Sequence, residues 1–414
     1  MDGWRNRKLG DLLEVKHGFA FLGEYFASEG THIVLTPGNF YDEGGFKDKG
    51  DKEKWYNGPV SADYVLSKGD LIVAMTEQAE GLLGSSAIVP RSGLYLHNQR
   101  LGLVQLRDGS RTDKRFVYYL FNSKPVRQQI RATASGLKIR HTAPSRIAEV
   151  KVHVPPLAVQ RRIAGILSAY DNLLENNTRR IQILEEMAQA IYREWFVDFR
   201  FPGHEKVPRI ASPLGNIPKG WEVVPLALLV DFAKGRKPAE TRKEALPGDV
   251  KLLLIDTLRG GEAELTSPAK LVLAEARDTI MVMDGASSCD VAIGFSGALG
   301  STLGRFRTTR PDSFSPHALY RFLEAKAEEF KSKNIGAAIP HANKDYILTQ
   351  PIALPPKAIA SSFQNQVEPI QRTIEILKSQ VQNLRRTRDL LLPKLISGEV
   401  DVSELDIKTG GNGG

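Results

Sequence analysis

The chain has 414 residues, of which 42% are hydrophobic and 25% are charged, and it carries a formal net charge of +8. Its one cysteine, Cys289, excludes internal disulfides and cysteine-rich zinc sites. The charged N-terminal segment does not resemble a signal peptide, and no apolar run approaches the roughly 20 residues that a membrane helix needs. We therefore expect a cytoplasmic protein of two or three domains, whose positive charge suits a nucleic-acid partner without requiring one.

Short apolar runs separated by glycine-rich turns occupy the first third of the chain. They predict strands at 32–35, 70–75, 100–106 and 149–154. A helical stretch at 113–123 precedes the last strand, and the segment 317–333 has the same place further along. These signals predict a globular domain of the α/β (mixed α+β) class, but the order of its strands does not follow from them.

The segment VPPLAVQRRIAGILSAYDNLLENNTRRIQILEEMAQAIYREWF, residues 154–196, predicts a long helix that begins at Pro155 and Pro156 and ends before the turn at 201–203. Apolar residues recur every seven positions, which is typical of a coiled coil. This first seam comprises Ile163, Leu167, Tyr170, Leu174, Asn177, Ile181, Leu184 and Ile191. The polar Asn177 either fixes the register against a partner asparagine or lies at a solvated gap.

The chain repeats itself at an offset of 200 residues. Gly136, Ile139, His141 and Ile147 have identical counterparts 200 positions later, and so do the two consecutive prolines. A second seam follows the same offset and comprises Phe363, Val367, Ile370, Ile374, Leu377, Val381, Leu384 and Leu391. Arg388 and Pro393 depart from the apolar pattern, and the proline predicts that the second helix ends or kinks near Leu392.

The repeat predicts two similar globular domains, each followed by a long helix, and the two helices pair as an antiparallel coiled coil. The expected boundaries are a first globular domain at 1–155, a first helix at 156–200, a second globular domain at 201–355, and a second helix with its tail at 356–410. Each helix spans roughly 50–60 Å at about 1.5 Å per residue. Equivalent faces of a DNA groove recur about 34–36 Å apart, so such a spacer suits a bipartite DNA reader. The same pair of helices would suit a purely mechanical spacer equally well.

The quoted helix, the segment NLRRTRDLLLPKLISGEV at 383–400, and the strings VMDGASSCDVAIGFSGALGSTLGRF and IPHANKDYILTQPIALPP resemble the specificity subunit of type I restriction–modification enzymes. The resemblance covers nearly the whole chain. The segment AMTEQAEGLLGSSAIVP of the first domain is a looser match, and Cys289 stands where the resemblance leads us to expect a small residue such as glycine.

The resemblance implies that the two globular domains are target-recognition domains, and that each reads one half of a split sequence in double-stranded DNA. It also implies that the helices dock two methyltransferase (modification) subunits, which modify adenine with S-adenosylmethionine. A motor–nuclease restriction subunit, with ATP and Mg, would join through the complex. We expect no cofactor and no metal in this chain itself. Trp195 and Phe196, which end the first helix, would pack against either a globular domain or a methyltransferase.

No catalytic motif argues for an enzyme. An adenine methyltransferase carries a DPPY- or NPPY-like motif, whereas both proline pairs here lie in VPPL and LPPK, and the phosphate-binding GXXXXGK[ST] pattern is absent. We therefore expect a non-catalytic subunit. Two alternatives stay open: a coiled-coil scaffold that binds proteins rather than DNA, and a self-contained modification enzyme, which the missing motifs disfavour.

Candidate DNA-binding residues are polar or basic side chains on turns, since arginine, asparagine and lysine supply most contacts to bases and phosphates. They are Lys138, Arg140, His141 and Arg146 in the first copy, and Lys234, Arg236, Lys237, Arg305, Arg307, Arg310, His341, Asn343 and Lys344 in the second. For each of them a solvated surface role competes with base contact. His141 and His341 recur at matching places, which favours a structural role for both.

Overall fold

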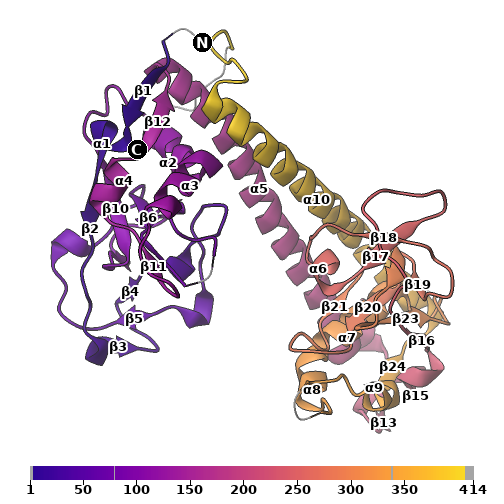
Figure 1. The fold of residues 1–414 in the computed structure, drawn as a ribbon. Helices are drawn as coiled ribbons and strands as arrows, with labels where there is room; N and C mark the ends of the chain where they lie inside the picture. The colour runs from indigo at the N-terminus through magenta and orange to yellow at the C-terminus, as the bar shows by residue number, and fades with distance from the viewer. Residues whose placement is uncertain (1–2, 79, 337–338, 406–414) are drawn as a thin grey trace. The chain divides into compact units, whose positions relative to one another are not determined.

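The computed structural model describes residues 3–78, 80–336 and 339–405. The chain divides into two compact units, and each unit combines separate stretches of sequence. Unit 1 contains residues 1–174 and 383–414, and unit 2 contains residues 175–382. Two long helices, α5 (Leu157–Tyr192) and α10 (Lys357–Ser397), each contribute one part to each unit (Figure 1).

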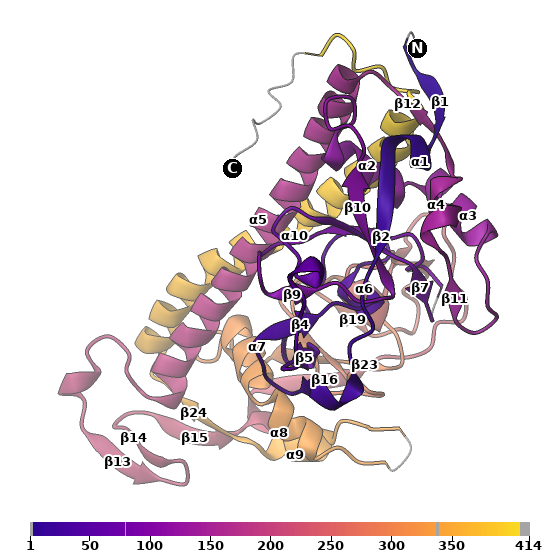
Figure 2. The same cartoon turned by 90° about the vertical axis from the view of Figure 1, so that its left-hand side faces the viewer.

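Unit 1 is built on a four-stranded antiparallel sheet in the order β2-β10-β6-β8. A second sheet has the order β3-β5-β4-β9, and two strand pairs, β1-β12 and β11-β7, complete the unit (Figure 2). The strands are β1 (Arg5–Lys8), β2 (Leu13–His17), β3 (Phe26–Ala27), β4 (His32–Val34), β5 (Trp55–Tyr56), β6 (Leu71–Ala74), β7 (Thr76–Glu77), β8 (Ser86–Ile88), β9 (Tyr95–Leu96), β10 (Leu101–Leu106), β11 (Arg140–His141) and β12 (Lys151–Val154). The short helices are α1 (Leu9–Leu12), α2 (Lys114–Asn122), α3 (Lys124–Ala132) and α4 (Pro144–Ala148).

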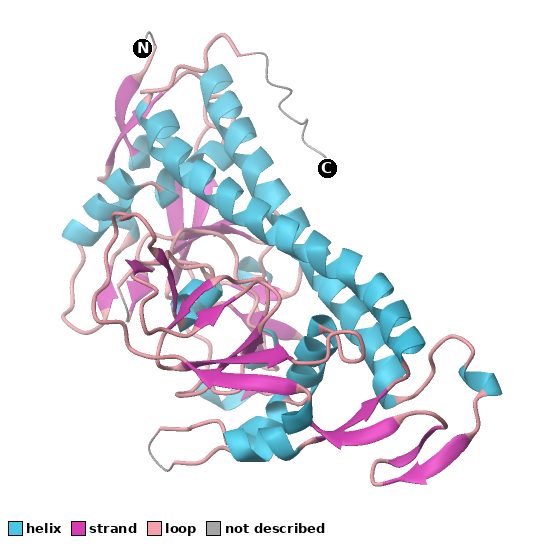
Figure 3. Cartoon of the chain, turned by 90° about the vertical axis from the view of Figure 1, so that its right-hand side faces the viewer, coloured by secondary structure: helices cyan, strands magenta, loops and turns pink. Residues whose placement is uncertain are grey.

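Unit 2 repeats the main sheet in the order β16-β23-β20-β21, and the pair β15-β24 corresponds to β1-β12. A further sheet has the order β18-β17-β22-β19, and β13 pairs with β14 (Figure 3). The strands are β13 (Arg209–Ser212), β14 (Gly215–Pro218), β15 (Glu222–Pro225), β16 (Val230–Lys234), β17 (Val250–Leu253), β18 (Leu265–Thr266), β19 (Leu273–Ala274), β20 (Thr279–Val282), β21 (Val291–Ala292), β22 (Gly297–Leu299), β23 (Leu303–Thr308) and β24 (Pro351–Leu354). The short helices are α6 (Ile255–Leu258), α7 (Pro316–Ala325), α8 (Ala327–Ser332) and α9 (Lys344–Thr349).

The structure confirms the mixed α+β class and the tandem repeat. The strands expected from apolar runs are β4, β6, β10 and β12, and the two expected helical stretches are α2 and the pair α7 and α8. The apolar run of β6 is buried at all four positions, because helices or other strands cover both faces of the sheet. The matching strand β20 is buried in the same way.

The two long helices pair in opposite directions. In unit 1 the first turns of α5, at Ile163 and Leu167, share a core with Leu395 and Ile396 at the end of α10. In unit 2 the last part of α5 shares a core with Phe363 and its neighbours at the start of α10. This arrangement is an antiparallel pair, as the sequence predicted. All sixteen residues of the two predicted seams are buried or half-buried.

Trp195 and Phe196 close α5 in a π-helical turn, Arg193–Val197, and both side chains are buried. The sequence left open whether these side chains pack against a globular domain or a methyltransferase. In the structure both of them pack in unit 2. The ring of Phe196 lies 5.8 Å from that of Trp221, which immediately precedes β15. The end of α5 is therefore part of the hydrophobic core of unit 2.

The sequence predicted that Pro393 ends or kinks the second helix near Leu392, and the predicted end is wrong, because α10 continues through Pro393 to Ser397. A proline inside a helix loses one backbone hydrogen bond. The following residues Leu395 and Ile396 are 1% and 7% exposed in the core of unit 1, and their burial offsets that loss. Tertiary packing thus overrides the local preference of proline.

Cys289 has a φ of +71°, a conformation that glycine adopts most readily. Its side chain is fully buried, and its thiol donates to the Oδ1 atom of Asn334 over 3.4 Å. Burial raises the pKa of this thiol to about 11. The backbone geometry explains why a glycine was expected here, and the buried contact shows what the cysteine side chain does instead.

Candidate nucleic-acid interface

A short loop in unit 1, residues 135–141, presents most of the first group of candidate residues. Its base is closed by two backbone hydrogen bonds of 3.0 and 2.8 Å that Ser135 and His141 exchange. Gly136 follows with a φ of +101°, and an added Cβ would lie 1.9 Å from the carbonyl oxygen of Ile139. Only glycine fits this position, because any side chain would clash with the backbone on the opposite side of the loop.

The tip of this first loop is exposed. Leu137 is 101% exposed and Ile139 is 39% exposed, and the side chains of Lys138 and Arg140 are also exposed. Isolated apolar side chains on a surface are common, but here they alternate with two cations on a closed loop. The tip therefore offers both positive charge and apolar contact to a partner.

His141 and Arg146 hold the loop in place. The Nδ1 atom of His141 lies 3.1 Å from the Oγ1 atom of Thr76, and β11 pairs with β7 at the same point. Arg146 donates from Nη1 to the carbonyl oxygen of Thr133 at 2.8 Å and to the Oγ atom of Ser135 at 3.1 Å. These two side chains connect the loop to the sheet and to α3.

Unit 2 contains the corresponding loop, of which residues 337–338 lie outside the described part of the chain. Ile335 and His341 exchange backbone hydrogen bonds of 2.9 and 2.8 Å, and Gly336 has a φ of +95°. Ile335 and Ile339 are 55% and 57% exposed. A closed, partly apolar loop thus occurs at the same place in both repeats.

A carboxylate anchors the histidine of the second loop, whereas a hydroxyl group anchors the histidine of the first. The Nδ1 atom of His341 lies 2.7 Å from Asp284 Oδ1, and Lys234 Nζ lies 3.1 Å from the other carboxylate oxygen. Burial acts to raise the pKa of Asp284, but the hydrogen bonds from His341 and Lys234 outweigh it, and the pKa is lowered. Asp284 occupies the place that Thr76 has in unit 1, because each is the bridge partner of the loop histidine in its own repeat.

A further lysine joins this cluster. Lys344 places its Nζ atom 5.8 Å from the centre of the Phe232 ring, and Phe232 lies two residues before Lys234 on the same face of β16. The neighbouring Asn343 caps α9, since its Oδ1 accepts the backbone N–H of Tyr346 at 3.0 Å. The structure therefore brings together Lys234, His341 and Lys344.

The other basic candidates of unit 2 fall into two groups: some form ion pairs with carboxylates, and the others are exposed. Arg305 binds the Asp231 carboxylate and the carbonyl oxygen of Leu273, and its side chain is 13% exposed. Arg307 donates to Asp278 from Nε at 2.7 Å and from Nη2 at 2.6 Å, and these hydrogen bonds raise its pKa. The exposed candidates are Arg236, Lys237 and Arg310.

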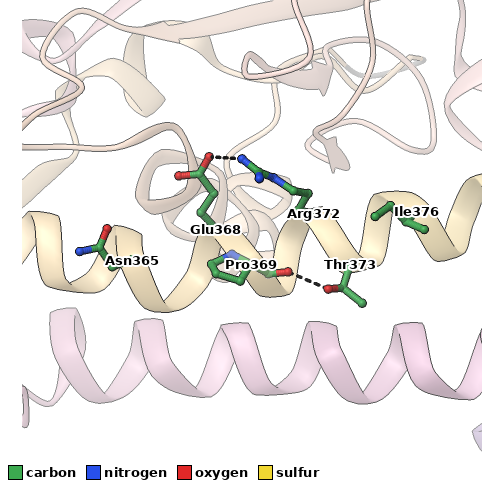
Figure 4. Close-up of a pocket in the computed structure, with 6 residues that line it drawn as sticks. All are labelled: Asn365, Glu368, Pro369, Arg372, Thr373 and Ile376. Carbon is green, nitrogen blue, oxygen red and sulfur yellow. Dashed lines mark hydrogen bonds and ion pairs between the residues drawn. The ribbon is translucent and has the colours of Figure 1, made fainter.

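An open groove runs along α10 in unit 2 (Figure 4). It is lined by Asn365, Glu368, Pro369, Arg372, Thr373 and Ile376. Arg372 and Glu368 form an ion pair of 3.3 Å beside it. Within the described residues, no group of three or more histidine, cysteine, aspartate or glutamate side chains could hold a metal ion, and no helix could cross a bilayer.

The family model for the type I restriction modification DNA specificity domain matches residues 1–186 and 218–385. The chain belongs to this family of specificity subunits. The two matched segments each contain one of the anchored loops and most of one long helix. The resemblance read from the heptads and from the repeated exit strands is thereby confirmed.

Two curated relatives and one solved structure agree with this assignment. The type I restriction enzyme MjaIX specificity subunit of Methanocaldococcus jannaschii is 24% identical over 301 residues, which cover 70% of each chain. The HindI specificity subunit of Haemophilus influenzae is 23% identical over 322 residues, covering 61% of this chain and 70% of the relative. The crystal structure of a type I restriction–modification S subunit from M. genitalium has the same fold, with a TM-score of 0.65 and 17% identity, covering 95% of this chain and 96% of that one.

Two features of the interface were not among the sequence candidates. Asp284 anchors His341 from a distance of 57 residues in the chain, and the exposed Leu137 and Ile139 are apolar. A search for basic and amide side chains passes over both kinds of residue. The repeat offset was the available signal, since Gly136 and Ile139 recur at 336 and 339.

Proposed function

We propose that this specificity subunit reads a bipartite target in double-stranded DNA, with one half-site contacted by each globular part. The recurrence of the anchored loop is the observation that carries this proposal. Both repeats keep the glycine, the exposed isoleucine and the bridging histidine, whereas the residues around them differ. A shared frame with different side chains is what two half-sites of different sequence require.

The chemistry of the loops suits the DNA grooves. In the first loop, Lys138 and Arg140 can donate to phosphates or to guanine, and Leu137 and Ile139 can contact a thymine methyl group. In the second, Lys234, His341 and Lys344 supply the donors. The candidates engaged by carboxylates, Arg305 and Arg307, would act by supporting the sheet rather than by touching bases. The remaining exposed candidates, Arg236, Lys237 and Arg310, would contact phosphates.

The long helices would dock two methyltransferase subunits. Support comes from large apolar side chains that are about half exposed on them. These are Leu173 and Leu390 in unit 1, and Ile183, Met187 and Ile376 in unit 2. Such residues are typical of the apolar centre of a protein–protein interface. The chain would itself be non-catalytic, with S-adenosylmethionine, ATP and Mg bound by methyltransferase and motor–nuclease partners.

The domain boundaries follow the same logic. Residues 1–155 and 201–355 would be the two target-recognition domains, and 156–200 and 356–410 the spacer helices with the tail. The antiparallel pairing of α5 with α10 supports a spacer whose length sets the gap between the half-sites. An equilibrium binding measurement tests the function directly.

In that experiment the chain is purified with a type I adenine methyltransferase subunit from the same organism, and its affinity for a library of DNA duplexes is measured at several salt concentrations. We expect binding that weakens steeply as salt rises and that selects a split motif, since phosphate contacts release counterions. Binding that is absent at every salt concentration, with an active methyltransferase, would instead favour a scaffold for proteins.

A further inference from the structure

A polar network in unit 1 connects three elements that the hydrophobic seam alone does not join. Tyr119 of α2 donates its hydroxyl to Asp171 Oδ2 of α5 at 2.6 Å. Arg388 of α10 donates from Nη1 to the other oxygen, Asp171 Oδ1, at 2.9 Å. One carboxylate thus holds the globular part, the first helix and the second helix together.

The network is largely shielded from water. The Tyr119 side chain is buried, and the side chains of Asp171 and Arg388 are 29% and 17% exposed. Burial and the neighbouring Asp171 carboxylate both raise the pKa of Tyr119. Burial also disfavours the charge on Arg388, but its hydrogen bonds to Asp171 and Asp389 raise its pKa overall. Tyr119 and Arg388 therefore keep the protons that they donate to Asp171.

The second repeat lacks this network. Counting 200 residues along the helices, Gln371 takes the place of Asp171, and Ala188 takes the place of Arg388. Alignment of the capped starts of α2 and α7 sets Arg321 in the place of Tyr119. Arg321 is 1% exposed and bonds Glu324 of its own helix, and its Nε and Nη2 atoms have no partner among the described residues.

The two ends of the helix pair thus use different interactions. In unit 2 the helices meet through Phe363, Val367 and the aromatic residues at the end of α5, with an amide contact of 3.4 Å from Asn177 to Gln380. An ion pair of 2.8 Å also joins Lys378 of α10 to Glu185 of α5, but these side chains are 49% and 37% exposed. Apolar seams tolerate alternative registers, whereas a single buried polar pair specifies one. The Arg388–Asp171 pair of unit 1 is more buried than the Lys378–Glu185 pair of unit 2, and it is therefore the stronger constraint on the register.

We propose that the Tyr119–Asp171–Arg388 network positions the first recognition domain by fixing the register of α5 against α10. A slip of one heptad moves one helix about 10 Å past the other. It would set Asp171 against Val381 or Leu395, seven residues on either side of Arg388, and would leave a carboxylate and a guanidinium without partners. The consequence for DNA, one permitted gap between half-sites, rests on the proposed function, whereas the register itself does not.

The test uses the full chain without DNA. Spin labels are attached to cysteines introduced at Leu173 and Leu390, which are 49% and 59% exposed on α5 and α10, while Cys289 stays buried and unlabelled. Pulsed electron paramagnetic resonance then gives the distribution of distances between the labels. We expect one narrow distribution in the otherwise unaltered chain.

The deciding variants change the sign of the charges. Arg388→Asp is expected to add a population displaced by up to about 10 Å, and the double variant Asp171→Arg/Arg388→Asp is expected to restore the single distribution. The control Asp389→Asn removes the charge of the other, 52% exposed partner of Arg388 and should leave the distribution unchanged.

If Arg388→Asp prevents folding, the double variant still decides, since recovery of both the fold and the narrow distribution supports the proposal. An unchanged distribution in Arg388→Asp overturns it, as does a double variant that recovers neither property. Because no DNA is present, failure of this test leaves the proposed DNA reading untouched. Absence of sequence-selective DNA binding by the unaltered chain, despite a single narrow distance distribution, would count against the proposed function instead.

Discussion

Phe196, just beyond the last turn of α5, packs edge-on against Phe363 near the start of α10, with ring centroids 4.8 Å apart and an angle of 79° between the rings. Phe363 also contacts Tyr192 and Trp195, and it is fully buried. One aromatic side chain of the second helix thus fills the space at the end of the first. This contact closes the core of unit 2.

Replacing Phe363 with alanine should therefore destabilise unit 2 by about 3–5 kcal/mol, the usual cost of a large cavity. Urea unfolding followed by the fluorescence of Trp195 and Trp221, both in this core, measures the change. Val197→Ala is the matched control, because Val197 is 54% exposed beside the same residues and its loss should cost less than about 0.5 kcal/mol. Equal effects of the two substitutions would contradict the packing described.

His97 makes the stability of unit 1 depend on pH. Burial lowers its pKa to about 4, and its Nε2 atom donates to the carbonyl oxygen of Leu101 at 2.9 Å. The unfolded chain takes up a proton near pH 6.5, but the folded protein does not until about pH 4. Stability is thus complete above pH 6.5 and falls as the pH decreases towards 4.

We expect a loss of about 2 kcal/mol from this histidine between pH 7 and pH 5. His97→Gln retains an N–H donor but cannot titrate, so its stability should change less over the same range. Urea midpoints at both pH values check this. An identical pH dependence in the two proteins would show that His97 does not cause it.

Gly136 is required by the geometry of the first loop. Gly136→Ala should distort the loop, because the added Cβ would meet the carbonyl oxygen of Ile139, and the affinity for DNA should fall at least tenfold. Gly109→Ala is the control, since a Cβ there meets nothing within 4 Å. Fluorescence anisotropy with the selected duplex measures both. A loop variant that keeps the affinity of the parent protein would remove the loop from the interface.

Arg307 and Arg310 should behave differently although both were candidates. Arg307→Ala leaves the buried Asp278 carboxylate without its partner and should lower stability by about 2 kcal/mol. Arg310→Ala changes an exposed residue and should leave stability intact while reducing the salt dependence of DNA binding by about one unit of slope. Thermal unfolding measures the change in stability, and fluorescence anisotropy measures the salt dependence of DNA binding. A destabilised Arg310→Ala variant, or an Arg307→Ala variant of unchanged stability, would contradict the prediction.

The sequence predicted the long helices because a seven-residue period persists over about five heptads and then recurs 200 residues later. It predicted β6 because a continuous apolar run marks a buried strand. It could not predict the strands of two residues, such as β7 and β11, since they have no measurable periodicity. The end of α10 was missed because the burial of Leu395 compensates for Pro393.

The candidate interface was predictable only in part. The repeated glycine and histidine marked both loops, but the anchors Thr76 and Asp284 lie 65 and 57 residues from their histidines. Pairings over such separations depend on the sheet, and the order of its strands was not available from the sequence. For the same reason Arg305 and Arg307 looked like free cations until their carboxylate partners were placed.

The helix pair should act as a spacer of defined length. Removing one heptad from α5 and the facing heptad from α10 shortens each helix by about 10 Å while keeping the seam in register. The gap between the half-sites should shorten, and both half-sites should keep their sequences. Selection from a duplex library with variable gaps measures this. A gap that stays the same would rule out the helices as the ruler.

The most direct measurement is a map of methylated adenines in the genomes of cells that carry a type I adenine methyltransferase subunit from the same organism, with and without the gene for the chain. The account predicts methylation within a split motif of fixed gap, which disappears when the gene is deleted. If methylation does not change on deletion, although the methyltransferase is active with an intact control specificity subunit, the chain does not direct recognition and the account is contradicted.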